Sequence, residues 1–126
     1  MLGDHPIYPV LLAKDLAAAR DFYHARLGLD ILSESEHLLV FRCGGGSQLR
    51  VSKSTTGTSD MQTQASWVVD DLRAEVADLR ARGVRVEDYD EPDLKTVDGI
   101  ADRGFAWAAW IIDPGGNALG IFQPKK

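Results

Sequence analysis

The chain has a single cysteine, Cys43, among its 126 residues. One thiol cannot form a disulfide within the chain, so the sequence gives no sign of an oxidising compartment. Long apolar runs are also missing, and none approaches the roughly 20 residues that a membrane-spanning helix requires. Residues 1–6 have neither the basic region nor the apolar stretch of a secretory signal. We therefore expect a cytoplasmic protein that has no membrane partner.

Positive charge is also in short supply. The chain has 14 Lys and Arg residues against 19 Asp and Glu residues, which gives a formal net charge of -5. This balance argues against nucleic acid as the main partner, because phosphate binding needs a basic face. The hydrophobic fraction of 44% and the charged fraction of 26% are typical of a soluble globular protein. The length suits one domain better than two.

The clearest local pattern is a strand, a tight turn and a second strand over residues 109–122. Two apolar runs flank the turn sequence Asp-Pro-Gly-Gly-Asn at 113–117. Pro114 presets φ, the two glycines can take positive φ, and Asn117 tolerates the left-handed region. The pattern predicts a β-hairpin. A hairpin fixes the register of its two strands, so alternation then shows which side chains share a face.

The first half of the chain is expected to form a strand, a helix and three further strands. Asp15 is placed to cap a helix that runs to about Leu27, and Gly28 is placed to end it. The expected strands cover residues 7–13, 29–33, 37–43 and 48–52, and a loop rich in Ser, Thr and Gly follows.

The second half repeats this order. A shift of about 56 residues places residues 12–16 on residues 68–72, and Asp71 caps a second helix that Gly83 ends. Strands are expected over 65–69 and 84–86 and on both sides of the hairpin turn. Neither half has enough apolar surface to stand alone. We therefore expect one α+β domain over 1–126, built from paired βαβββ modules (about 5–54 and about 63–124) that form a cup-shaped, half-open barrel.

A long polar segment connects the second helix to the hairpin, over residues 88–104. Connections of this length in a compact domain are often covers over a site. We interpret the segment as a lid over the cup, and a simple surface insertion is the alternative.

The spaced motifs resemble those of the vicinal-oxygen-chelate superfamily, which contains glyoxalase I, extradiol dioxygenases and the bleomycin- and fosfomycin-resistance proteins. The resemblance rests on Asp15-Leu16, Phe22-Tyr23, Leu27-Gly28-Leu29, Asp70-Asp71-Leu72 and the 113–117 turn. It implies paired βαβββ modules and often a homodimer. It does not fix one chemistry, because this fold hosts lyases, isomerases, oxygenases and binding proteins.

Catalytic members of that superfamily hold a divalent metal with His, Glu or Gln side chains at four strand positions. In this sequence the resemblance places those positions on Tyr8, on Gln48 or Arg50, on Gln64, and on Gly120. A catalytic metal needs about three good protein ligands and one open position. A phenol, amides and a glycine do not provide them, so we expect neither a metal nor another cofactor.

Strand alternation predicts which side chains line the cup. Aromatic walls, a floor of small residues and a few polar groups are typical of a pocket for a flat ligand. Arg50 could pair with a carboxylate or stack on a ring. The alternative is that the aromatic rings fill the cup themselves. The predicted ligand-binding residues are Tyr8, Gln48, Arg50, Gln64, Ser66, Ala108, Trp110, Gly120 and Phe122.

The sequence therefore predicts a metal-independent protein that binds, and sequesters, a flat apolar or aromatic small molecule such as an antibiotic. The alternative is an enzyme of the superfamily, a lyase, isomerase or dioxygenase with atypical metal ligands or none. Cys43 is read as a structural thiol, because no base is placed beside it. Trp107 has the opposite parity to Trp110 and is expected beneath a helix or at a dimer interface.

Overall fold

The computed structural model describes residues 1–58 and 62–125. Module one consists of β1 (Val10–Ala13), α1 (Leu16–Arg20), the π-helical turn η2 (Asp21–Arg26), β2 (Asp30–Glu34), β3 (Leu38–Arg42) and β4 (Gln48–Lys53). Short 3-10 turns occupy η1 (Leu2–Asp4) and η3 (Gly44–Gly46). The sheet order is β1-β4-β3-β2, with β1 parallel to β4 and the other pairs antiparallel. Asp15 caps α1 by accepting a hydrogen bond from the Ala18 backbone N–H, as the sequence predicts.

Module two repeats this plan. It contains β5 (Thr63–Val68), α2 (Leu72–Ala81), β6 (Asp90–Glu91), β7 (Leu94–Lys95), β8 (Ala101–Asp102), β9 (Ala106–Ile112) and β10 (Ala118–Pro124). The sheet order is β5-β10-β9-β8, again with one parallel pair, β5 and β10. Asp71 caps α2 through the Ala74 backbone N–H. The internal repeat thus corresponds to two similar four-stranded sheets, each with one helical segment.

One predicted strand is wrong. Residues 84–86 form no strand; the fourth strand of module two is β8 instead. The alternation Val84-Arg85-Val86 reflects burial, because both valines lie in the core with at most 6% of their surface exposed. In the structure, β1 is also shorter than the strand predicted over residues 7–13. Residues 7–9 lie outside β1, where Pro9 has no N–H to donate to a ladder.

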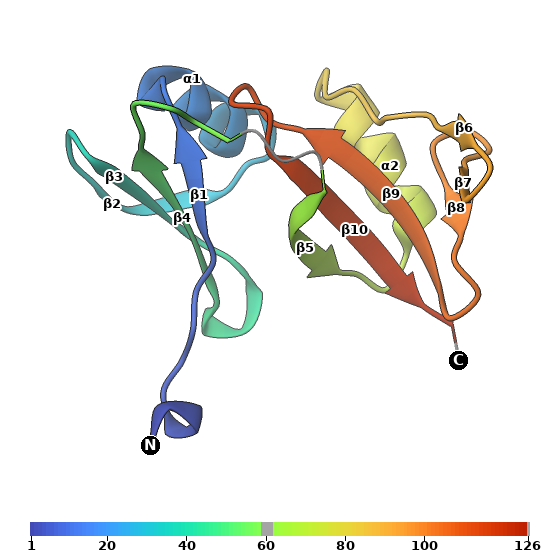
Figure 1. The fold of residues 1–126 in the computed structure, drawn as a ribbon, viewed down its shortest axis with the longest axis horizontal. Helices are drawn as coiled ribbons and strands as arrows, with labels where there is room; N and C mark the ends of the chain where they lie inside the picture. The colour runs from blue at the N-terminus through green and yellow to red at the C-terminus, as the bar shows by residue number, and fades with distance from the viewer. Residues whose placement is uncertain (59–61, 126) are drawn as a thin grey trace.

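The two sheets lie side by side and do not close into a barrel (Figure 1). Their helix-facing sides share one core, which spans residues from Leu11 to Ile121. Across the junction, the Tyr23 hydroxyl donates to Asp113 Oδ2 at 2.6 Å, and Asn117 Nδ2 donates to the Leu12 carbonyl at 2.9 Å. The α+β fold with paired modules is therefore confirmed. No helix covers the opposite sheet faces, called the open faces below, although residues of the 88–104 segment pack on part of the module-two face.

The hairpin turn at 113–117 joins β9 to β10 as predicted. Asp113 Oδ1 accepts hydrogen bonds from the backbone N–H groups of Gly115 and Asn117. Gly116 has φ of 87°, a conformation that side chains disfavour. A Cβ on Gly115 would lie 3.2 Å from the Leu12 carbonyl oxygen. One glycine thus serves the turn, and the other permits close packing against β1.

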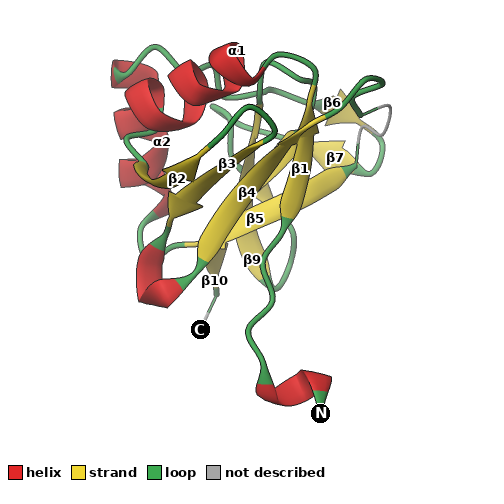
Figure 2. Cartoon of the chain, turned by 90° about the vertical axis from the view of Figure 1, so that its left-hand side faces the viewer, coloured by secondary structure: helices red, strands yellow, loops and turns green. Residues whose placement is uncertain are grey.

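The N-terminal segment, residues 1–9, extends beyond the sheets (Figure 2) and contacts β4 only near its end, where the Pro9 carbonyl accepts a hydrogen bond from the Arg50 N–H at 3.1 Å. We call it the N-terminal arm. Its apolar side chains Leu2 and Ile7 are 90% and 93% exposed. Within the described part of the chain, no helix is long and apolar enough to cross a membrane.

Candidate ligand-binding site

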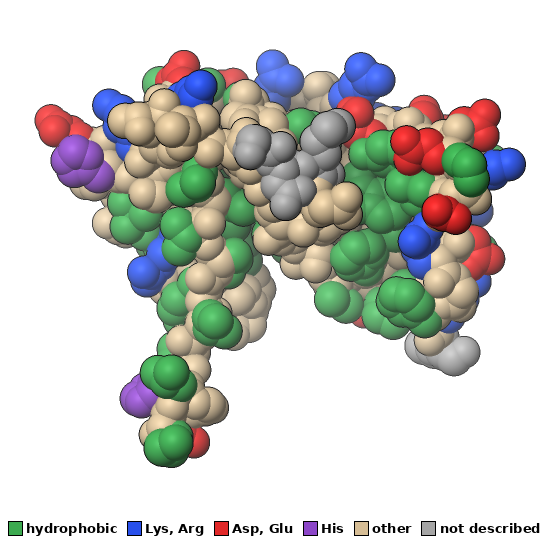
Figure 3. Space-filling model, in the orientation of Figure 1, with side chains coloured by type: hydrophobic (Ala, Val, Ile, Leu, Met, Phe, Trp, Pro, Cys, Tyr) green, Lys and Arg blue, Asp and Glu red, His purple; other side chains and the backbone are tan. Residues whose placement is uncertain are grey.

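Alternation along the strands gives each sheet one face toward the helices and one open face. Leu11, Ala13, Leu49 and Val51 belong to the shared core, whereas Val10 and Leu12 of β1 are 53% and 39% exposed. In module two, Ile111, Leu119 and Ile121 lie in the same core. The residues predicted for the cup have the opposite parity and so lie on the open faces. Figure 3 shows hydrophobic side chains along the N-terminal arm and on module two, with a hollow between them.

On module one, three of the predicted residues contact one another. The Arg50 guanidinium lies 5.1 Å from the centroid of the Tyr8 ring, within the range of a cation–π contact. Arg50 Nη2 donates to Gln48 Oε1 at 3.2 Å. Arg50 is held in register by β4, where it sits opposite Val10 of β1 and Val40 of β3. Among the described residues, Arg50 therefore has an aromatic and an amide neighbour on the open face of this sheet and no ion-pair partner.

On module two, the predicted residues form an aromatic cluster. Trp110 is only 9% exposed, and its ring meets those of Tyr89 and Phe122 edge to face at 5.7 and 6.2 Å. Trp110 Nε1 donates to Thr63 Oγ1 at 3.0 Å. Ala108 is fully buried beside Trp110. The Trp110 ring is thus held rigidly, and its own neighbours cover much of it.

Gly120 leaves room that a ring of this cluster occupies. A Cβ at this position would lie 2.8 Å from Cζ of Phe122 and 3.1 Å from the Thr63 methyl group. The missing side chain therefore provides packing space for Phe122 as well as a flat floor.

Gln64 and Ser66 lie on the open face of β5. The Gln64 amide is held at both ends, since Nε2 donates to Thr58 Oγ1 at 2.7 Å and Oε1 accepts from the Ala118 N–H at 3.2 Å. Ser66 is exposed and is paired in register with Gly120. The module-one residues belong to the β1-β4-β3-β2 sheet or to the segment before it, and these residues belong to the β5-β10-β9-β8 sheet. The two sheets lie side by side in Figure 1.

Sequence reasoning missed three residues around Trp110: Tyr89 and Leu94, which pack on its cluster, and Thr63, which accepts its indole hydrogen bond. Tyr89 and Leu94 come from the 88–104 segment, where β6 and β7 form a small hairpin, and they pack on the cluster with Ala101. Burial, followed by the nearby charges of Glu87 and Glu91, raises the pKa of Tyr89. Tyr89 is therefore a neutral phenol at physiological pH. Its position beside Trp110 depends on the hairpin, which no sequence spacing indicated.

The metal that the superfamily resemblance implies does not fit these residues. The four positions carry a phenol, an amide or a guanidinium, a second amide and a glycine. The Gln64 amide oxygen is already bonded to a backbone N–H. Among the described residues, no three side chains of His, Cys, Asp or Glu gather closely enough to hold an ion. A glycine supplies no ligand atom and a guanidinium repels a cation, so at most a phenol and two amides remain, and these are weak ligands for a catalytic metal.

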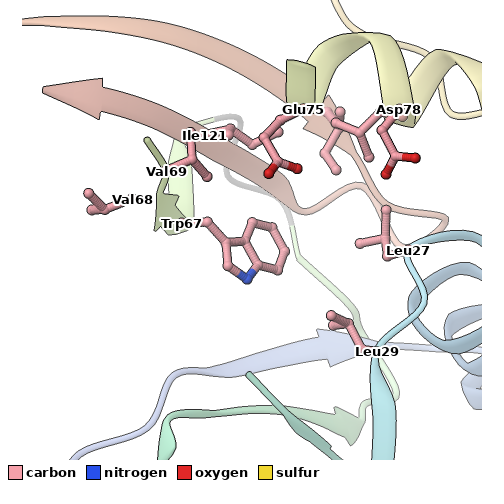
Figure 4. Close-up of a pocket in the computed structure, with 10 residues that line it drawn as sticks. Leu27, Leu29, Trp67, Val68, Val69, Glu75, Asp78 and Ile121 are labelled. Atoms are coloured by element: carbon pink, nitrogen blue, oxygen red, sulfur yellow. The ribbon is translucent and has the colours of Figure 1, made fainter. Parts of the chain in front are cut away.

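A separate cleft of about 250 Å³ lies between the modules on the helix-facing side. Leu27 and Leu29 of module one lie across from Trp67 and from two acids of α2, Glu75 and Asp78 (Figure 4). This cleft contains none of the residues predicted for the cup.

Trp107 also lies on the helix-facing side, near Leu72 at the start of α2, with Lys125 Nζ 4.1 Å from its ring centroid.

Comparison with known structures gives several matches of the whole fold. The crystal structure of a bleomycin-binding protein complexed with bleomycin matches with a TM-score of 0.73 and 18% identity, covering 96% of this chain and 99% of that one. TnmS3, an antibiotic binding protein from Streptomyces sp. CB03234, matches with a TM-score of 0.64 and 24% identity, covering 96% of this chain and 98% of that one. Lactoylglutathione lyase from Agrobacterium tumefaciens matches with a TM-score of 0.64 and 22% identity, covering 94% of this chain and 92% of that one. At these identities the matches establish the fold alone.

No curated protein matches the chain in sequence. A family model does match it, over residues 5–121, which is nearly the whole chain. That model describes the glyoxalase, bleomycin resistance protein and dioxygenase superfamily. The chain, with its two modules and the Asp-Pro-Gly-Gly-Asn turn between its last strands, is therefore a member of the glyoxalase/bleomycin resistance protein/dioxygenase superfamily.

Proposed function

We propose that this protein binds a flat, largely aromatic small molecule on the open faces of its sheets and sequesters it without chemical change. The observation that carries the proposal is the pairing of a rigid aromatic cluster with the Tyr8–Arg50 stack on faces that the helices leave uncovered. Aromatic faces favour a stacked guest, and a few fixed polar groups orient it. A bleomycin-binding protein and the antibiotic binding protein TnmS3 share this fold.

Chemical inertness follows from the groups available. The open faces carry amides, a serine, phenols and an arginine, and neither a phenol nor a guanidinium is a good base near pH 7. Tyr89, whose pKa is raised further, is a still weaker acid. An enzymatic role would need an acid, a base or a metal that these residues do not supply.

A homodimer completes the proposed site. Ile7, Val10 and Val68 are 93%, 53% and 73% exposed, and all three lie on the N-terminal arm or the open faces. A monomer that leaves these apolar side chains exposed has a reason to associate, because large exposed apolar surfaces mark interaction sites. A second copy covering this region would enclose the ligand between the two chains.

The direct test titrates EDTA-treated protein with anthraquinones and polyaromatic antibiotics, following heat and tryptophan fluorescence. The proposal expects saturable binding to at least one compound, quenched fluorescence and unchanged ligand mass after release. Absence of saturable binding across the panel would remove its support. Conversion of a bound compound, or a stoichiometric divalent metal that binding requires, would favour the enzymatic alternative.

A further inference from the structure

The Arg50 guanidinium has hydrogen-bonding capacity that the protein does not use. Nη2 donates to Gln48, and the plane lies against the Tyr8 ring. Arg50 Nε, however, is inaccessible to solvent and has no hydrogen-bond partner among the described residues. A buried donor that has lost water and gained no acceptor is unfavourable, so such groups usually have a role or a missing partner.

The charge of Arg50 is also uncompensated. The other arginine on this face, Arg42, pairs with Asp30 at 2.9 Å at the outer edge of the sheet. Among the ion pairs of the described residues, none includes Arg50. Its strand neighbours across the ladder are Val10 and Val40, which contribute no charge. The partly buried cation thus lies between apolar side chains of the two neighbouring strands.

We infer that the ligand carries an ionised oxygen, a ring-borne carboxylate, which Arg50 receives while the ring lies along the aromatic surface. This inference rests on the proposed function and names the chemical class of its ligand. A guanidinium donates two parallel, charge-assisted hydrogen bonds to a carboxylate. The contacts with Tyr8 and Gln48 hold the Arg50 guanidinium in place, so its side chain loses little conformational freedom when the ligand binds. The protein's net negative charge opposes this only weakly, since separated surface charges are screened beyond about 8 Å at physiological salt.

The test compares two probes that differ in charge and hardly in shape: anthraquinone-2-carboxylate and anthraquinone-2-carboxamide. We expect the wild-type protein to bind the carboxylate at least tenfold more tightly than the amide. In Arg50→Gln this ratio should fall to within twofold of unity, through loss of carboxylate affinity alone. Arg50→Lys keeps the positive charge but cannot donate two parallel hydrogen bonds, so it should give an intermediate ratio. Arg42→Gln removes a cation from the same face and should leave the ratio unchanged.

Each result supports or overturns the inference. Equal binding of both probes by the wild type overturns it and leaves the proposed function standing, whereas no binding of either probe counts against the proposed function itself. A tenfold preference that survives in folded Arg50→Gln also overturns it. A third result would also overturn the inference: the wild type shows no preference for the carboxylate probe, and Arg50→Gln no longer forms a dimer. Arg50 would then pair with a carboxylate of the second copy. Circular dichroism and thermal midpoints establish that the variants are folded.

Discussion

Tyr23 and Asp113 come from different modules and meet in a buried hydrogen bond of 2.6 Å. The same carboxylate accepts from Asn117 Nδ2 at 2.8 Å, and Asn117 in turn reaches the Leu12 carbonyl. The turn that shapes the last hairpin therefore also joins the modules. Burial, together with the charge of Asp113 and the hydrogen bond to it, raises the pKa of Tyr23 far above its ordinary value.

Tyr23→Phe should destabilise the protein by about 1.5–3 kcal/mol, the usual value for a hydrogen bond to a charged group. The effect should also depend on pH. The unfolded Tyr23 ionises near pH 10 and the folded one does not, so the folded state binds more protons and the wild type loses stability as pH rises beyond about 10. Urea unfolding at pH 8 and pH 11 should show a steeper fall for the wild type than for Tyr23→Phe. Parallel slopes would contradict this account.

At the residue scale, the sequence predicted which sheet face a side chain lies on better than it predicted which residues that side chain contacts. Alternation placed Tyr8, Arg50, Trp110 and Phe122 on the open faces, because the parity of a strand depends only on local geometry. The Tyr8–Arg50 stack and the partners of Trp110 could not be predicted, because they depend on how distant segments pack. Whether these residues bind a ligand stays a prediction.

At the scale of elements, β5 offers a direct test of the two faces. Ser66 is exposed on the open face, whereas its neighbour Ala65 packs against the core. Ser66→Phe should abolish ligand binding by filling the site, with little change in the free energy of unfolding. Ala65→Phe should cost about 1–3 kcal/mol by overpacking. Urea unfolding and the anthraquinone titration measure both effects, and a reversed pattern would contradict the assignment of faces.

The hairpin turn makes a second element-scale prediction. Gly116→Ala forces a side chain into a positive-φ conformation and should destabilise the protein by about 1–2 kcal/mol. Gly44→Ala is the control, because Gly44 lacks positive φ and a Cβ there would meet nothing within 4 Å. Thermal unfolding of the two variants tests this, and equal midpoints would show that the turn tolerates the strain.

The elements that sequence reasoning placed incorrectly lie where local pattern and tertiary pairing disagree. Residues 84–86 have strand-like alternation but pair with no strand, and the two-residue β8 completes the sheet instead. The sequence predicts that the 88–104 segment is a lid. It contributes Tyr89 and Leu94 to the aromatic cluster, and whether it moves stays a prediction.

At the scale of the whole molecule, the internal repeat predicted the fold because each module is incomplete alone. The single chain is incomplete in a similar way, because apolar side chains on its open faces stay exposed. We expect a dimer in sedimentation equilibrium. Removal of residues 1–7, which carry the exposed Leu2 and Ile7 and leave Tyr8 in place, should weaken dimerisation and ligand binding together. A monomeric wild type that binds ligand with full affinity would contradict this arrangement.

The central claim is that aromatic surface and fixed polar groups act here where relatives use a metal. Calorimetric titration of EDTA-treated protein with anthraquinone-2-carboxylate, followed by elemental analysis of the same sample, tests it most directly. The account predicts saturable binding, one ligand per chain, and no stoichiometric divalent metal. Binding that appears only after a divalent metal is restored would contradict it.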